Sequence, residues 1–260
     1  MTIKLAPFNG VSLSTDLVLS LLKLASRRTD IKAGRSLRRL MLSHGLYTHT
    51  ILADHIIHLF ALCKSLSESN QSFRMVPYPS VFTWNIIISA HLKLGKVEEA
   101  MDLFIEMQNR GSKADSVTFS CILKVCANLG ALKQGRFTHD LVVRSGLKEN
   151  VILDSTLVDM YAKCGSLREA HNVFNNMEKQ DVITWGIMIA AYAEENGIIA
   201  LELFNEMQGH GFLKPNIVVF SSALRACGNM KNYRQGKFLH DRIERSGLQS
   251  DVVIGSTLVD

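Results

Sequence analysis

The stretch SVTFSCILKVCANLGALKQGRFTHDLVVRSGLKENVILDSTLVD, residues 116–159, returns 101 residues later as IVVFSSALRACGNMKNYRQGKFLHDRIERSGLQSDVVIGSTLVD, residues 217–260. The two stretches align without a gap and are identical at 21 of 44 positions. Self-similarity of this extent at a fixed period indicates a repeat architecture, in which each unit packs against its neighbours. The unit of the fold is therefore the repeat.

The 101-residue shift continues upstream of this stretch. It places Val81 on Val182 and Trp84 on Trp185. Each 101-residue block divides into units of 35, 35 and 31 residues, which gives seven whole units and the nine-residue start of an eighth. The expected organisation is a leader at 1–14 followed by units at 15–49, 50–80, 81–115, 116–150, 151–181, 182–216, 217–251 and 252–260.

Each unit has the pattern of two short amphipathic helices. Apolar residues recur at i, i+3, i+4 and i+7 in the second half of a unit, as in Ala100, Leu103, Phe104 and Met107. The first half carries a separate stripe, as in Trp84, Ile87, Ile88 and His91. Two helices of this length cannot bury their apolar faces alone, so the units must stack into a solenoid.

Glycines recur at two positions of the units. The glycines between the two helices are Gly95, Gly130, Gly165 and Gly197, and those after the second helix are Gly111, Gly146, Gly211 and Gly247. Glycine suits the left-handed backbone conformation that ends many helices. The pattern predicts a helix end at each of these positions.

Charge is distributed unevenly along the chain. Lys and Arg total 29 and Asp and Glu total 24, a formal charge of +5 over 260 residues. Residues 1–50 carry +6, so the remaining 210 residues carry −1. A basic, acid-poor start is typical of a transit peptide, but these basic residues also lie inside the first units, and both interpretations stay open. We therefore do not expect electrostatic attraction between the whole array and phosphate groups to determine which ligand binds.

Composition excludes several classes of protein. Hydrophobic residues make up 47% of the chain, which excludes a disordered protein. Five cysteines without a CxxC pair argue against a secreted disulfide scaffold. No run of about 18 apolar residues is present, so no membrane-spanning helix and no membrane partner are expected. We expect a soluble helical protein of a reducing compartment.

Catalytic motifs are missing from the sequence. A nucleotide deaminase needs HxE and PCxxC motifs to hold zinc and its acid/base glutamate, and neither occurs. There is no phosphate-binding glycine loop and no GxSxG motif. His139 and His240 recur in phase and are interpreted as structural, like the in-phase cysteines. We expect no catalytic residue, no metal, no cofactor and no enzyme activity from the chain by itself.

The units resemble a known family, the pentatricopeptide repeats. VFTWNIIISAHLKLGKVEEAMDLFIEMQNRGSKAD, residues 81–115, is similar to its P unit, and VILDSTLVDMYAKCGSLREAHNVFNNMEKQD, residues 151–181, to its S unit. The alternation of 35, 35 and 31 residues resembles the plant PLS subclass, whereas tetratricopeptide repeats keep a constant 34. In those terms 15–49, 116–150 and 217–251 are L-like, 50–80, 151–181 and the truncated 252–260 S-like, and 81–115 and 182–216 P-like.

The resemblance implies both a fold and a function. The fold is all-α, a right-handed helical-hairpin solenoid. The function is sequence-specific binding of single-stranded organellar RNA, one base per repeat, in RNA processing or cytidine-to-uridine editing. An editing deaminase or cofactor would act in trans, because the E and DYW extensions of PLS relatives are absent and the chain stops within a unit, like a fragment. The implied location is a mitochondrion or a chloroplast.

The family reads a base with the fifth and the last residue of a repeat. Asn85 with Asp115 resembles a uridine reader, and Ser155 with Asp181 a guanine reader. Three further pairs have an implied base: Ser120 with Asn150 implies adenine, Ser221 with Asp251 implies guanine, and Gly186 with Asn216 implies a weak purine preference. Two pairs have no familiar assignment, Asp54 with Ser80 and Leu19 with His49. The code is unreliable in L units, and Gly186 has no side chain to offer a base.

An apolar second residue in each repeat would pack against the base. The candidates are Phe82, Val117, Ile152, Ile183, Val218 and Val253. The polar closing residues have an alternative role, because Ser, Asn and Asp before a helix are common N-caps, and both roles can coexist. A helical-repeat scaffold that binds a protein is the alternative function.

Overall fold

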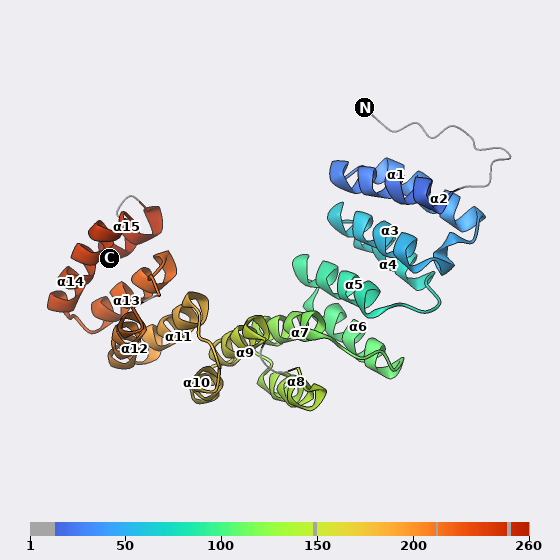
Figure 1. Cartoon of the computed structure of the whole chain (residues 1–260). Coiled ribbons are helices and arrows are strands. Elements are labelled where there is room, and N and C mark those ends of the chain that lie inside the picture. The colour runs from blue at the N-terminus through green and yellow to red at the C-terminus, as the bar shows by residue number, and fades with distance from the viewer. Residues whose placement is uncertain (1–13, 148–149, 212, 249–250, 260) are drawn as a thin grey trace. The chain divides into compact units, whose positions relative to one another are not determined.

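The computed structural model of the protein describes residues 14–147, 150–211, 213–248 and 251–259. Within these ranges there are fifteen α-helices, one 3₁₀ helix and no strand (Figure 1). The all-α prediction is therefore confirmed. The proposed leader at 1–14 lies outside the described residues except for Ser14, as does Asp260.

The helices alternate between the first and the second helix of a pair. The first helices are α1 (Thr15–Arg28), α3 (Thr50–Leu62), α5 (Val81–Lys93), α7 (Ser116–Leu129), α9 (Val151–Lys163), α11 (Val182–Glu195), α13 (Ile217–Asn229) and α15 (Val252–Val259). The second helices are α2 (Ile31–Ser43), α4 (Leu66–Arg74), α6 (Val97–Asn109), α8 (Leu132–Ser145), α10 (Leu167–Asn175), α12 (Gly197–Gly209) and α14 (Tyr233–Ser246), and a 3₁₀ turn (Leu46–Thr48) follows α2. Each first helix begins at the first residue of an expected unit.

The chain forms two compact units that meet inside α7, one ending at Val125 and the other beginning at Cys126. In the first, α1, α3 and α5 lie side by side, and α3 and α5 are each covered by the helix that follows. In the second, α9, α11, α13 and α15 lie side by side in the same way, with α10, α12 and α14 against them. Successive hairpins are thus stacked, as the two stripes per unit require.

The core between successive hairpins is built on the predicted apolar stripes. Trp84 and Trp185, at equivalent positions of α5 and α11, are fully buried. Each meets a phenylalanine from the second helix of the preceding pair edge-on, Phe73 at 4.8 Å and Phe174 at 4.7 Å between ring centroids. Aromatic pairs of this geometry stabilise a core beyond the area they bury. The tryptophans therefore join one hairpin to the next.

The glycine prediction is right at seven positions and wrong at Gly197. The other seven have positive φ, between 62° and 75°. Gly197 instead begins α12, because Asn196 caps that helix by accepting from the N–H groups of Ile198 and Ile199. A Cβ at Gly197 would lie 2.7 Å from the Met230 sulfur and 3.1 Å from the Ala226 carbonyl oxygen. This glycine permits close packing rather than a left-handed turn.

Gly135→Ala should destabilise the protein, whereas Gly236→Ala at the equivalent position of α14 should not. A Cβ at Gly135 would overlap the buried Met160 side chain, while one at Gly236 meets only Cys227 Cβ, at 3.9 Å. Overpacking costs about 1–3 kcal/mol, and replacing an unconstrained helical glycine stabilises by roughly 0.5–1 kcal/mol. Urea unfolding of both variants should move the midpoints in opposite directions; a shared direction would contradict this packing.

Candidate nucleic-acid interface

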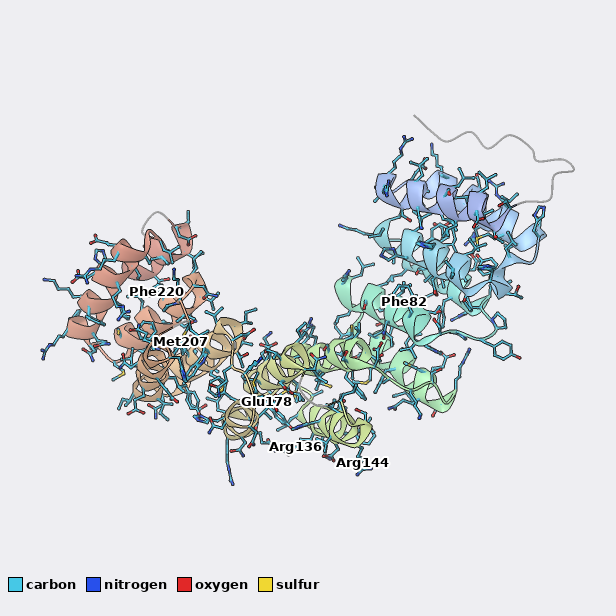
Figure 2. All side chains as sticks on the ribbon, in the orientation of Figure 1. Phe82, Arg136, Arg144, Glu178, Met207 and Phe220 are labelled. Carbon is cyan, nitrogen blue, oxygen red and sulfur yellow. The ribbon has the colours of Figure 1, made fainter. Side chains whose placement is uncertain are left out.

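A row of exposed apolar side chains occupies the second position of the first helices. The six predicted residues Phe82, Val117, Ile152, Ile183, Val218 and Val253 are all exposed, and Ile51 on α3 adds a seventh; their exposed fractions run from 52% to 74%. Figure 2 marks Phe82 on α5. Single exposed apolar residues are ordinary, but the same helical position is exposed in hairpin after hairpin. Ile51 was missed although it is the second residue of its unit.

The predicted reading pair Asn85 and Asp115 is brought together by the fold. Asn85 Nδ2 donates to both carboxylate oxygens of Asp115, at 3.0 and 3.1 Å. Thr118 Oγ1 donates to Asn85 Oδ1 at 2.6 Å, and the Thr118 backbone N–H donates to Asp115 Oδ1 at 2.8 Å. A carboxylate can only accept, so these contacts fix which way the Asn85 amide faces.

The same hydrogen bonds keep Asp115 ionised. Burial alone would raise the pKa of its carboxyl, but the hydrogen bonds from Thr118, Asn85 and the backbone of Val117 together hold that pKa below its ordinary value. Asp115 therefore stays a charged acceptor throughout the neutral range. It caps α7 and orients Asn85 with one group.

Ser155 and Asp181 are joined through a third residue rather than directly. The Ser155 hydroxyl lies 2.8 Å from Thr184 Oγ1, and Thr184 donates to Asp181 Oδ1 at 2.7 Å. Ser155 Oγ also lies 2.6 Å from the Val151 carbonyl oxygen of its own helix, so its single proton is shared between that carbonyl and Thr184. The guanine-reading pair of the prediction is thus linked, but through the hydroxyl of Thr184.

Asp54 and Ser80, which had no assigned base, form a third network of this kind. Thr83 Oγ1 donates to Asp54 Oδ1 at 2.6 Å and lies 2.9 Å from Ser80 Oγ. The shared element of the three networks is a threonine at the third position of the following unit: Thr83, Thr118 and Thr184. Sequence analysis missed these threonines, although each stands before an aromatic residue in its first helix.

The other predicted pairs are not joined by such a network. Asp251 caps α15, and Ser221 donates to the Val218 carbonyl of its own helix at 3.1 Å. Gly186 is buried with Val219 3.5 Å from where its Cβ would be, and Asn216 caps α13. The third residue of the following unit is here Val219 or Ile254, which has no hydroxyl. Ser120 is half-buried on α7, and Asn150 caps α9.

Capping is the role that all five closing residues share. Each accepts from backbone N–H groups of the next first helix; they are Asp115, Asn150, Asp181, Asn216 and Asp251. The capping alternative is therefore confirmed. Among these five, Asp115 and Asp181 combine capping with a link to the fifth residue of their own unit, and Ser80, which caps α5, does the same through Thr83.

Six of these residues line one groove of about 680 Å³ in the first compact unit. They are Ile51, Asp54, Phe82, Asn85, Asp115 and Val117. Four basic residues, His55, His58, Lys64 and Lys93, line the same groove. Burial lowers the pKa of both histidines, so they are neutral at pH 7 and become charged on acidification. The groove combines apolar surfaces, polar groups of fixed orientation and local positive charge.

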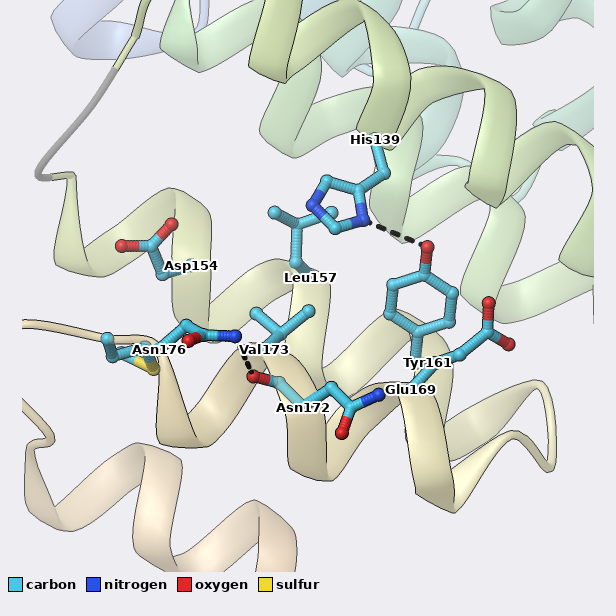
Figure 3. Close-up of a pocket in the computed structure, with 9 residues that line it drawn as sticks. His139, Asp154, Leu157, Tyr161, Glu169, Asn172, Val173 and Asn176 are labelled. Atoms are coloured by element: carbon cyan, nitrogen blue, oxygen red, sulfur yellow. Dashed lines mark hydrogen bonds between the residues drawn. The ribbon is translucent and has the colours of Figure 1, made fainter.

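A second cavity of about 350 Å³ lies among α8, α9 and α10 (Figure 3). His139 Nδ1 is hydrogen-bonded to the Tyr161 hydroxyl at 2.9 Å, and His171 with Tyr192 repeats this contact in the next hairpin, at 3.1 Å. Burial lowers the pKa of His139 and raises that of Tyr161 to about 12, which makes the pair neutral. This is a recurring helix–helix contact, in keeping with a structural His139, and no predicted base contact lines the cavity.

Other chemistry has little support among the described residues. Ligand atoms of His240, Asp241 and Glu244 come within 4.8 Å of one another on α14, in a position open to solvent. His240 Nδ1 and Glu244 form a loose contact of 3.9 Å, and no further side chain converges on them. In the described part of the chain, no helix has the length and apolar character needed to cross a bilayer.

Thr118→Val should destabilise the first compact unit by about 1–3 kcal/mol, because it leaves Asn85 Oδ1 and the Asp115 backbone N–H without their partner. Thr118→Ser should restore most of this loss. The matched control is Thr156→Val: this buried threonine donates only to Ile152 of its own helix. Chemical unfolding measures all three, and equal losses for both valine variants would contradict a special role for Thr118.

Parts of the chain match models of a known repeat family. Family models match residues 79–128 (PPR repeat family), 155–182 (PPR repeat) and 179–230 (pentatricopeptide repeat domain). Two pentatricopeptide repeat-containing proteins of Arabidopsis thaliana, At1g03540 and the chloroplastic At4g18520, are each 32% identical over 93% of this chain. A mitochondrial one, At3g09040, is 30% identical over 83% of the chain. The chain spans about two-fifths of the first two relatives and about one-fifth of the third.

A solved structure has the same arrangement of helices. The pentatricopeptide repeat protein PPR10, in complex with an 18-nt psaJ RNA element, superposes with a TM-score of 0.78 at 21% identity. The match covers 96% of this chain and 38% of PPR10, so the two share the helical-repeat fold. Pentatricopeptide repeats are thus found by family models at residues 79–128 and 155–230 of this chain.

Proposed function

We propose that the chain binds single-stranded RNA in a sequence-specific manner, one base per repeat. The observation that carries the proposal is the groove lined by Asn85, which is largely buried and held by Asp115 and Thr118, beside the exposed Phe82 and Val117. Unstacked bases are bound by proteins in this way, with an apolar surface against the ring and a polar group on its Watson–Crick edge.

The chemistry of the groove suits RNA better than a protein segment. An amide offers a donor and an acceptor side by side, which match the N3–H and carbonyl of uracil. The array beyond residue 50 has no net positive charge, but Lys64 and Lys93 place positive charge in the groove, and His55 and His58 add to it on acidification. Phosphate binding is thereby local to the groove.

The role in the cell follows from the relatives. We infer that the chain acts in the recognition of RNA; it spans about two-fifths of the first two relatives. Relatives named chloroplastic and mitochondrial favour an organelle. The RNA is then a transcript of that organelle, recognised for processing or for cytidine-to-uridine editing. Assignment of the units to the L, S and P classes belongs to the same proposal.

Asn85→Thr should change the preference at one RNA position from uridine towards guanine and leave the others alone. Selection from a randomised RNA pool, followed by sequencing, measures this. Asn109→Thr, at the exposed end of α6, is the matched control and should leave the whole profile unchanged. Saturable binding of RNA with an unaltered profile in Asn85→Thr would reject the reading pair. If the chain bound no RNA at all, the alternative function would be favoured, in which the row of exposed apolar residues binds a protein.

Acidification should tighten binding of a short oligouridine. Burial places the pKa of His55 and His58 below 6.5 in the free protein, whereas bound phosphates favour the charged imidazolium. Affinity should therefore rise as the pH falls from about 7.5 to about 5.5. The log–log salt slope should steepen by about 0.7 for each histidine that contacts a phosphate.

The double variant His55→Gln, His58→Gln should flatten this pH dependence, and His240→Gln on the exposed face of α14 should not. Oligouridine is chosen so that the measurement does not depend on the base at Asp54, whose pKa is raised by burial. A pH dependence that survives in the double variant would place the phosphates away from this groove.

A further inference from the structure

We propose that Asp54 reads a guanine, in the position next to the base read by Asn85. The inference rests on the RNA binding proposed above and extends it to a unit whose pair, Asp54 and Ser80, carries no familiar assignment. It makes the groove of the first compact unit a site for two neighbouring bases, a guanine and a uracil.

Asp54 occupies in α3 the place that Asn85 occupies in α5. Each is the fifth residue of its unit, lines the groove and is bound by a threonine at the third position of the next unit. Each is accompanied in the groove by two exposed apolar residues from second positions: Ile51 and Phe82 for Asp54, and Phe82 and Val117 for Asn85. Phe82 is shared, as expected for a side chain that lies between adjacent bases.

The carboxylate of Asp54 has acceptor capacity to spare. Only 8% of the residue is exposed, and Thr83 is the sole hydrogen-bond donor to it among the described residues. A carboxylate has about four lone-pair sites, and a buried one is costly when they are unfilled. The unfilled sites adjoin the groove, where a ligand can supply donors.

Among the four bases, guanine has the edge that satisfies this carboxylate. Its N1–H and its N2 amino group are two adjacent donors, and an acceptor-only group binds both at once. Adenine and cytosine place a ring acceptor beside their one amino donor, and uracil places carbonyl oxygens on both sides of N3–H. Each of these three edges turns a lone pair towards the carboxylate, which is unfavourable.

The hydrogen bond from Thr83 fixes the position of the Asp54 carboxylate for binding guanine. Thr83 is fully buried, and its hydroxyl is fixed by Ser80, whose backbone N–H donates to it at 3.1 Å. Ser80 Oγ in turn accepts from the Thr83 N–H and completes a capping box. The Asp54 carboxylate is thus hydrogen-bonded to the start of α5, the helix that carries Phe82 and Asn85.

The test compares RNA pools selected by the wild-type chain, Asp54→Asn and Asn85→Thr. Asn85→Thr identifies the RNA position that belongs to α5, and the wild type should show guanine at a position adjacent to it. Asp54→Asn should lower the guanine preference there about tenfold, in line with the discrimination of a bidentate contact, and change no other position. Asp102→Asn, which removes an exposed carboxylate from α6, is the matched control.

A chemical change in the RNA provides a second measurement that does not depend on a variant. Inosine keeps the N1–H of guanine and lacks the N2 amino group, so replacing that guanosine by inosine should weaken wild-type binding. The same replacement should have no effect on Asp54→Asn, whose melting curve confirms that it is folded.

The outcomes separate the two proposals. If no variant and no wild-type selection enriches any RNA sequence, the proposed function fails. If RNA is selected but guanine is not preferred next to the Asn85 position, or if Asp54→Asn or inosine changes nothing there, the assignment of Asp54 is overturned while RNA binding stands.

Discussion

The hydrogen bond between the last residue of one repeat and the start of the next helix organises this protein. A carboxylate, amide or hydroxyl at that point satisfies backbone N–H groups that the helix itself leaves unpaired. In Asp115 the same carboxylate also holds the Asn85 amide. The cap therefore fixes the start of a helix and the orientation of a reading group with one side chain.

The third-position threonines explain why only some repeats have a rigid polar site. Thr83, Thr118 and Thr184 bond both the closing residue and the fifth residue of the preceding repeat. Where Val219 or Ile254 stands in that place, the closing residue caps the helix and the fifth residue is left to its own helix.

Much of the fold and part of the site follow from periodicity alone. The starts of the first helices, the buried tryptophans and the exposed second-position residues depend on local spacing, and a 101-residue duplication displays that spacing twice. Gly197 shows the limit: its spacing resembles that of the helix-ending glycines, yet its role is decided by the Met230 side chain and the Ala226 carbonyl of the next hairpin. The hydrogen bonds of the threonines and the shared groove could not be predicted from the sequence, because they join residues 29 to 33 positions apart.

The sequence by itself determined the stacked helical hairpins and their repeat lengths, because both are set by a recurring local spacing, and the family resemblance supplied the candidate reading positions. Only the tertiary structure decided which candidates are joined, that Ser155 reaches Asp181 through Thr184, and that Asp54 lies in the groove with Asn85. These facts depend on how one hairpin packs on the next. That packing places a buried hydroxyl within hydrogen-bond distance of two other repeat positions, which the spacing of residues along a single helix does not encode.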